Sequence, residues 1–353
     1  MMKITFLTPH IDISGGVKII LGYASGLAER GHEVNIICPQ RNPRKIRRLA
    51  VVYPKRAIMN LLRHKPNWID VAANIRYVSS FKEKYIPEAD VVVATAWQTA
   101  YFVNSYSAKR GRKFYLFQHY ERLWHDGTDN DCDEGSYNLP LKKIVISSCL
   151  QEILKKRFSQ ESILIENPID HHIFYPTRYG VAKTKRICML YHHLPLKGVA
   201  DGIRAFEITK KGYPDAQLVM FGSRARSEFF EYEFHYRPSN EQLREVYNSC
   251  DVFVCPSWRE GFGLPSAEAM ACRCALVTTD NGGCRDYAIH GKTALVSPPQ
   301  NPQALADNLG RLLSDEAMLE RIAESGCEHI RQFTWERAVS RLEEVFLKDF
   351  NNS

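Results

Sequence analysis

A short buried strand that leads through a glycine turn into a helix limits the folds open to this chain. The four apolar residues Val252–Cys255 read as the strand, Gly261 and Gly263 form the turn, and a helix is expected to begin near Leu264. A strand joined to a helix in this way is the repeating unit of parallel α/β sheets. Such sheets bind ligands at the carboxyl ends of their strands, so this corner is also the first candidate site.

The same alternation of strands and helices runs along the rest of the chain. Further strands are expected at 3–8, 33–38, 91–95, 113–118, 143–146, 162–165, 186–190, 275–279 and 293–296, with two more that end at Gly222 and at Tyr236. Helices are expected at 16–30, 97–107, 148–158, 302–313 and 316–332, with one more that runs from about Gly198 through Lys211. The order predicts an α/β protein with doubly wound parallel sheets of the Rossmann type.

Chain length and a proline-containing linker predict two domains. The 353 residues are too many for one ordinary core and suit two domains of about 150 residues each. The segment 166–176 contains Asn-Pro and a later proline, which disfavour regular structure and mark a linker. We therefore expect domains at 1–168 and 169–334, with a last helix over 335–353 capped by Thr334.

Composition excludes several classes of protein. Apolar residues make up 44% and charged residues 25%, which is ordinary for a globular chain, and no apolar run reaches the roughly 20 residues that span a bilayer. Basic residues cluster at 41–48 and continue through Lys55, Arg56, Arg63 and Lys65. The cluster is either a solvated face or a peripheral contact with anionic membrane. Nucleic acid is not expected, because no recognised binding motif accompanies it.

Cysteine usage predicts a reducing compartment. Ten cysteines show no regular framework, and the chain starts as a strand rather than a signal peptide. The expected location is the cytoplasm, at the inner face of the cytoplasmic membrane if the basic cluster binds lipid. A zinc site at Cys250, Cys255, Cys272 and Cys274 is disfavoured because the spacing is not that of a zinc knuckle. Reduced core cysteines are expected instead.

An acidic loop at 128–135 invites a metal interpretation that its spacing does not support. A calcium loop needs glycine at its sixth position and glutamate at its twelfth, where this chain has Glu134 and Pro140. Asp129 and Asp131 have the D-x-D spacing of a known metal-binding motif, but that motif belongs to a fold other than the one expected here. We expect no metal and no other cofactor.

Two carboxylates flank the glycine turn of the candidate site. Glu260 precedes the turn and Glu268 lies one turn into the helix, so both can face the crevice and accept hydrogen bonds from vicinal hydroxyls. The N–H groups of the first helical turn favour phosphate oxygens, which together suggests a sugar nucleotide. The alternative is purely structural, since an acidic residue in a first turn gains roughly 0.3–1 kcal/mol from the helix dipole alone.

The spacing Glu260-x7-Glu268 around its glycine turn resembles the signature of retaining glycosyltransferases of the GT-B fold, family 4, also called glycosyl transferases group 1. The interdomain segment 167–176, with Asn-Pro-x-Asp and Phe-x-Pro, resembles the family's linker. The resemblance covers nearly the whole chain, weakly in the first half. It implies two Rossmann-like domains facing a central cleft, an acceptor-side domain first and a nucleotide-sugar domain second, with the last helix packed back on the first domain.

The resemblance also implies roles for individual residues. Gly15-Gly16 would face the donor phosphates and the acceptor, His119 would contact the transferred sugar, and Lys197 would neutralise the diphosphate. The family has Gly-Arg five residues before the lysine, where this chain has Tyr191-His192, so either His192 or another basic residue, Arg224 or Arg226, supplies the missing charge. His235 and Tyr236 are expected beside the nucleotide base. The implied catalytic residues are His119, Lys197 and Glu260, and the implied donor-binding residues are Gly15, Gly16, His192, Lys197, Glu260, Gly261, Phe262, Gly263, Leu264 and Glu268.

The expected activity is retaining transfer of a sugar from a nucleotide-sugar donor to a hydroxyl of a glycan or lipid-linked acceptor, in polysaccharide or glycolipid biosynthesis and without a metal. A UDP-sugar such as UDP-glucose is preferred because UDP is the commonest nucleotide in the family. Two alternatives stay open: a nucleotide-sugar epimerase of the same fold, and a non-catalytic subunit that binds the nucleotide sugar.

Overall fold

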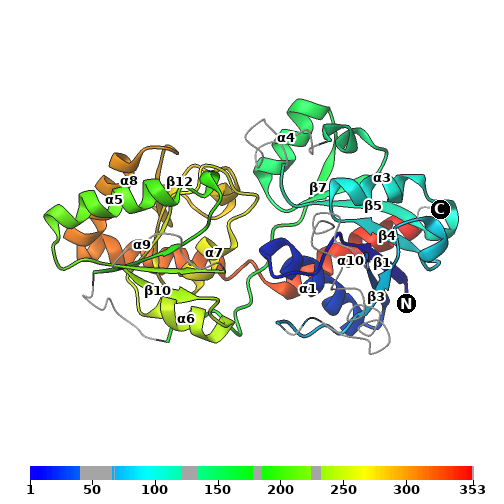
Figure 1. Cartoon of the computed structure of the whole chain (residues 1–353), viewed down its shortest axis with the longest axis horizontal. Coiled ribbons are helices and arrows are strands. Elements are labelled where there is room, and N and C mark those ends of the chain that lie inside the picture. Colours follow the sequence, from blue (N-terminus) through cyan, green and yellow to red (C-terminus); the bar gives the residue numbers. More distant parts are fainter. Residues whose placement is uncertain (40–65, 67, 121–132, 178–184, 224–231, 352–353) are drawn as a thin grey trace, which may run out of the picture. The chain divides into compact units, whose positions relative to one another are not determined.

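The computed structural model describes residues 1–39, 66, 68–120, 133–177, 185–223 and 232–351 (Figure 1). These residues form two compact units. Unit 1 comprises Met1–Pro168 together with Trp335–Ser353, and unit 2 comprises Ile169–Thr334. Each unit contains one parallel sheet with helices packed against it, so each is Rossmann-like.

Unit 1 is built on a seven-stranded sheet in the order β3-β2-β1-β4-β5-β6-β7. The order reverses between β1 and β4, where Ile4 pairs with Val91, and this is the topological switch point at which such sheets bind ligands. The strands are β1 (Lys3–Leu7), β2 (Glu33–Pro39), β3 (Asn74–Val78), β4 (Val91–Ala94), β5 (Arg112–Phe117), β6 (Lys142–Val145) and β7 (Ser162–Leu164). The helices are α1 (Gly15–Glu29), α3 (Trp97–Ser105), α4 (Ser148–Phe158) and α10 (Trp335–Asn351).

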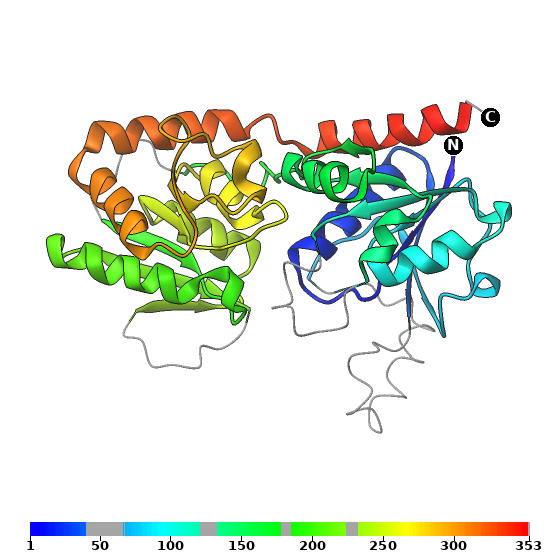
Figure 2. The same cartoon turned by 90° about the horizontal axis from the view of Figure 1, so that it is seen from above.

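The last helix of the chain packs against the first helix of unit 1 (Figure 2). A methyl group added at Gly22 of α1 would lie 2.0 Å from the Trp335 ring, and one at Gly26 would lie 2.7 Å from Val339. Two glycines one turn apart therefore let α10 approach the α1 backbone closely. Arg30 at the end of α1 holds the same helix through an ion pair with Glu343 at 2.7 Å.

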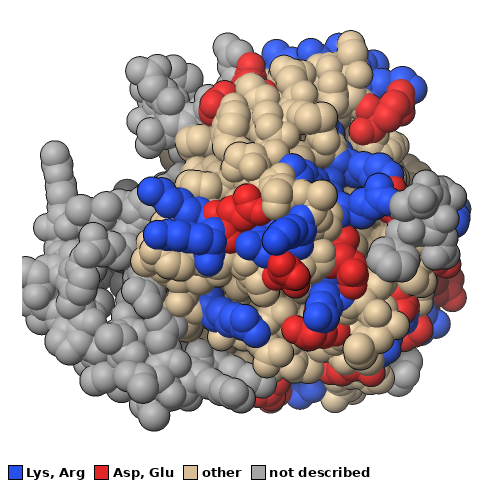
Figure 3. All heavy atoms as spheres, turned by 90° about the vertical axis from the view of Figure 1, so that its right-hand side faces the viewer, with Lys and Arg blue, Asp and Glu red and all other residues tan. Residues whose placement is uncertain are grey.

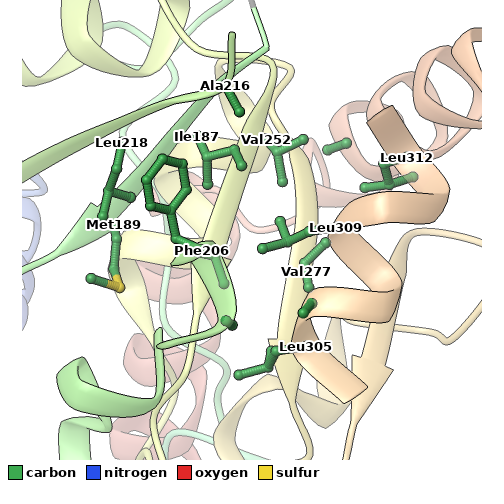
Figure 4. Packing of buried hydrophobic residues seen from close by; sticks show 14 of the residues in the cluster. Ile187, Met189, Phe206, Ala216, Leu218, Val252, Val277, Leu305, Leu309 and Leu312 are labelled. Carbon is green, nitrogen blue, oxygen red and sulfur yellow. The ribbon is translucent and has the colours of Figure 1, made fainter. Parts of the chain in front are cut away.

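Unit 2 is built on a six-stranded sheet in the order β10-β9-β8-β11-β12-β13. The strands are β8 (Arg186–Leu190), β9 (Gln217–Gly222), β10 (Glu233–Tyr236), β11 (Val252–Cys255), β12 (Ala275–Thr279) and β13 (Ala294–Ser297), and the helices are α5 (Val199–Gly212), α6 (Asn240–Asn248), α7 (Leu264–Ala271), α8 (Pro302–Ser314) and α9 (Glu316–Ile330). Figure 4 shows one side of its core, where Phe206 of α5 and Leu309 of α8 pack on strand residues such as Val252. Strands covered on both faces need the continuous apolar sequence that β11 has.

The expected strands and helices agree with the observed ones except for two omissions. The edge strand β3 was not predicted, because its side chains are partly exposed and show no continuous apolar run. Helix α6 was not predicted either, although Ser239 and Gln242 form a capping box at its start.

The charged segment at 41–65 that suggested membrane contact lies outside the described residues, as do Asp129, Asp131, Arg224 and Arg226. On the face shown in Figure 3, described Lys and Arg side chains are interspersed with Asp and Glu instead of forming a field of one sign. None of the helices in the described ranges is both long and apolar enough to cross a bilayer.

Candidate functional site

The glycine turn between β11 and α7 has the geometry that its sequence predicts. Gly263 is the N-cap of α7 and has φ +89°, a conformation that other residues adopt only with strain. A methyl group at Gly263 would also lie 2.6 Å from the hydroxyl of Tyr287. That buried hydroxyl lies 2.8 Å from the Phe262 carbonyl and 3.0 Å from the Gly263 carbonyl. The turn thus requires glycine for its backbone and for the space that Tyr287 occupies.

A second glycine turn packs directly against the first. The Glu260 N–H donates to the Asn281 carbonyl at 3.0 Å, and Glu260 forms an isolated parallel bridge with Gly282. A methyl group at Gly283 would lie 2.6 Å from the Phe262 nitrogen. The Asn-Gly-Gly sequence after β12 therefore supports the backbone on both sides of Glu260. Sequence reasoning identified both turns but not that they touch.

Lys197 reaches the same corner from the neighbouring strand, β8. It ends a short 3₁₀ helix, η6 (Pro195–Lys197), and the next residue, Gly198, has φ +61°. A methyl group at Gly198 would lie 2.1 Å from the Pro256 carbonyl oxygen, and the Trp258 N–H donates to the Leu196 carbonyl at 2.7 Å. The loops that follow β8 and β11 are thus in backbone contact, which brings Lys197 to Glu260.

Lys197 and Glu260 form an ion pair at the centre of the site. The Lys197 Nζ lies 2.7 Å from one Glu260 oxygen and 2.8 Å from the other. Their side chains are only 12% and 10% exposed. A pair so shielded is screened little by salt, and removing one partner would leave the other charge poorly solvated. The sequence predicted both residues in the site but not their contact with each other.

Ser257 is a site residue that the sequence analysis missed. Its hydroxyl donates to Glu260 Oε1 at 2.8 Å, and its carbonyl accepts a hydrogen bond from the buried Thr279 hydroxyl. Ser257 is 4% exposed, so it holds the carboxylate from the protein interior. Its position could have indicated this role, because a small polar residue stands there two positions after a buried strand and three before the glutamate.

A small, shallow pocket lies at this corner. Lys197, Glu260, Gly263 and Ser266 contribute to its wall, and the remaining lining comes from Leu190, Phe253, Val254, Cys255, Pro256, Ser257 and Pro265. Because these residues belong to β8 and β11, to the loops that follow these strands and to the start of α7, the pocket lies at the carboxyl end of the sheet, where the sequence placed it.

The helix start offers fewer free donors than expected. Pro265 has no N–H, and the N–H groups of Ser266 and Ala267 donate to the Gly263 carbonyl at 3.0 and 3.3 Å. Within the first turn of α7, Pro265 and Ser266 therefore offer no N–H group to a ligand. Lys197 becomes the main positive charge among the residues that line the pocket.

Glu268 lies on α7, two residues after Ser266, and is not one of the residues that line the pocket. It is 6% exposed. Burial raises the pKa of the Tyr247 hydroxyl, and the negative charge of Glu268 raises that pKa further. The carboxylate that the structure pairs with Lys197 is that of Glu260.

His192 is engaged by its own loop. Its Nδ1 accepts a hydrogen bond from the Leu194 N–H at 3.2 Å, and its ring stacks on His193 with 4.7 Å between centroids. A ring nitrogen that accepts a hydrogen bond carries no proton, so His192 would have to give up this bond to become the cation that the missing arginine provides.

The predicted residues of unit 1 meet at the carboxyl end of its own sheet. Gly15 and Gly16 begin α1, and His119 follows Gln118 after β5. A methyl group at Gly16 would lie 3.1 Å from Gln118 Oε1, so the glycine loop and the segment containing His119 are neighbours.

Tyr236 and His235 end the edge strand β10. Tyr236 is 53% exposed and stacks against the Arg237 guanidinium at 5.2 Å, whereas His235 contacts Glu233 at 2.8 Å. Of the two expected at the base, Tyr236 therefore has the more accessible ring.

Metal-binding clusters are absent from the part of the chain that the structure describes. The four cysteines considered for zinc, Cys250, Cys255, Cys272 and Cys274, are buried and form no disulfide.

Comparison with known proteins relates this geometry to a family. Residues 175–329 match the family model described as glycosyl transferases group 1. The uncharacterized glycosyltransferase YqgM of Bacillus subtilis is 30% identical over 223 residues, 60% of this chain and 62% of that protein. The capsular polysaccharide biosynthesis glycosyltransferase CapM of Staphylococcus aureus is 29% identical over 168 residues, 43% of this chain and 44% of that protein. The chain thus spans less than two thirds of the length of the curated relatives it matches.

Solved structures share the fold across the whole chain. Sucrose-phosphate synthase from Thermosynechococcus elongatus has a TM-score of 0.78 at 17% identity and covers 100% of both chains. Anabaena Alr3699/HepE, solved with UDP and glucose, has a TM-score of 0.75 at 15% identity and covers 99% of this chain and 100% of its own. Residues 175–329, which contain the Lys197–Glu260 pair, thus match the glycosyl transferases group 1 family model, and the chain has the GT-B fold.

Proposed function

We propose that this protein transfers a sugar from a nucleotide-sugar donor, a UDP-sugar such as UDP-glucose, to a hydroxyl of a glycan or lipid-linked acceptor in polysaccharide or glycolipid biosynthesis. The Lys197–Glu260 pocket carries the proposal, since it pairs a cation suited to phosphate with a carboxylate suited to sugar hydroxyls inside the family-matched segment. UDP is favoured because a protein of the same fold was solved with UDP-glucose, and the biosynthetic role follows the printed name of CapM.

The reaction that we propose proceeds with retention of anomeric configuration. The bond between the anomeric carbon and the diphosphate oxygen breaks, the acceptor oxygen bonds to the same face, and its proton passes to an oxygen of the leaving diphosphate. Lys197 stabilises the negative charge that develops on the diphosphate. Glu260 accepts hydrogen bonds from the sugar hydroxyls, Glu268 binds the ribose, and His119 contacts the transferred sugar.

Two further parts of the proposal concern conditions. We propose that catalysis needs no divalent metal, because Lys197 supplies positive charge at the pocket. We also propose peripheral contact with anionic membrane through the basic residues at 41–65, at the inner face of the cytoplasmic membrane.

Ligand screening followed by product analysis tests the function. A nucleotide sugar at 100 times its dissociation constant stabilises a protein by about 2.7 kcal/mol, so thermal shifts with UDP-, GDP- and ADP-sugars identify the donor. Donor incubated without acceptor then separates an epimerase, which converts it, from a transferase. Donor binding without turnover on any glycan or lipid-linked acceptor indicates the non-catalytic subunit.

A further inference from the structure

The Glu260 carboxylate has hydrogen-bond partners within the protein itself. Lys197 lies within hydrogen-bond distance of both its oxygens, at 2.7 and 2.8 Å, and Ser257 donates to Oε1 at 2.8 Å. A carboxylate offers about four acceptor positions, so most of its capacity is used within the protein. The same Lys197 is the cation that the pocket presents to phosphate.

We propose that the donor diphosphate competes with Glu260 for Lys197, and that Glu260 becomes available to sugar hydroxyls only when a diphosphate has drawn Lys197 away. The inference rests on the proposed function, because it assigns the order in which one site recognises the two halves of a nucleotide sugar. A diphosphate bears enough negative charge to take the ammonium from a carboxylate. A free sugar is neutral and does not.

Ser257 keeps the Glu260 carboxylate in place while Lys197 moves from it to the diphosphate. Its hydroxyl stays on Glu260 Oε1 from the buried side, and its own carbonyl is held by Thr279. When Lys197 leaves, Glu260 therefore keeps its position and presents the oxygen that Lys197 releases. The site thereby discriminates against free sugars, since their hydroxyls would have to displace a charged partner to reach Glu260.

The competition makes an unusual prediction for binding of the nucleotide alone. Free UDP has no sugar for Glu260 to bind, so in the wild type the carboxylate only weakens UDP binding, because it holds Lys197. A change that weakens the Lys197–Glu260 pair should therefore increase the affinity for UDP. We expect Glu260→Gln to bind UDP about tenfold or more tightly than the wild type, because hydrogen bonds between charged groups are the strong ones and the wild type must break them.

A second variant separates competition from simple repulsion between Glu260 and the diphosphate. Glu260→Asp keeps the negative charge but is shorter by one methylene, so it weakens the contact with Lys197 while leaving the repulsion in place. Competition predicts that this variant also binds UDP several-fold more tightly than the wild type. Repulsion alone predicts no gain. Asp215→Asn is the matched control, because Asp215 forms a similar two-oxygen pair with Lys185, at 3.1 and 2.8 Å, but lies 65% exposed on the surface.

Isothermal titration of wild type, Glu260→Gln, Glu260→Asp and Asp215→Asn with UDP, after thermal unfolding has verified that each is folded, decides the matter. Tighter binding by both Glu260 variants with no change in the control supports the inference. Tighter binding by Glu260→Gln alone, or by neither, overturns it. A wild type that binds none of UDP, GDP and ADP would instead refute the proposed function. If GDP or ADP binds in place of UDP, that nucleotide is used in the same titrations.

Discussion

Replacing Gly263 by alanine tests whether the first glycine turn needs both its backbone conformation and the space beside it. Alanine is strained in the left-handed backbone conformation of this position, which should lower the free energy of unfolding by about 1–2 kcal/mol. The added methyl also meets the Tyr287 hydroxyl at 2.6 Å, and displacing that buried group from its carbonyl partners should cost a further 1–3 kcal/mol. We therefore expect unit 2 to lose about 2–5 kcal/mol of unfolding free energy.

Gly291→Ala is the matched control in the same unit. Gly291 also has a positive φ, +74°, but no atom lies within 4 Å of an added methyl. It should show the backbone cost without the steric one, and urea unfolding of both variants, followed by intrinsic fluorescence, measures the difference. Adding Tyr287→Phe to Gly263→Ala should recover part of the loss, because the ring remains and the obstructing oxygen is gone. Equal losses in the two alanine variants would refute the reasoning.

Three other predictions follow from the proposed function. Glu268→Gln should weaken UDP by about 10- to 150-fold, the effect of about 1.5–3 kcal/mol for a charged hydrogen bond to the ribose, whereas unchanged affinity by calorimetry would remove Glu268 from the site. Sugar transfer should persist in EDTA, because Lys197 neutralises the charge of the diphosphate. Loss of activity in EDTA that only manganese or magnesium restores would contradict this. Co-sedimentation with anionic liposomes should exceed that with neutral ones and fall with salt if the residues at 41–65 bind the membrane, and equal binding to both would exclude that contact.

Sequence patterns predicted what depends on local chemistry. Continuous apolar runs predicted strands such as β11 and β12 with the bounds observed, and paired glycines predicted the turns at Gly263 and Gly283. These features are encoded by neighbouring residues. The open edge strand β3 was missed because its side chains are partly exposed and its neighbours in sequence carry no matching signal.

Contacts between distant segments were beyond the sequence patterns. Lys197 and Glu260 are 63 positions apart, and their pairing depends on the adjacency of β8 and β11, which the order of elements along the chain does not fix. The same holds for Ser257, whose role appears only once the glutamate is placed. The sequence suggested His192 as a substitute cation, but only the loop geometry reveals that its Nδ1 accepts a hydrogen bond from the Leu194 N–H.

The packing of α10 on α1 has a consequence for how the chain is made. Trp335 and Val339, which fill the space above Gly22 and Gly26, are translated more than 300 positions after those glycines. Unit 2 is a continuous segment that ends at Thr334, so all of its residues have left the synthetic site before α10 does. We expect unit 2 to become protease-resistant first on the ribosome. The face of α1 that packs on α10 stays uncovered until α10 has been made. The unit whose synthesis starts first should be the last to complete its fold.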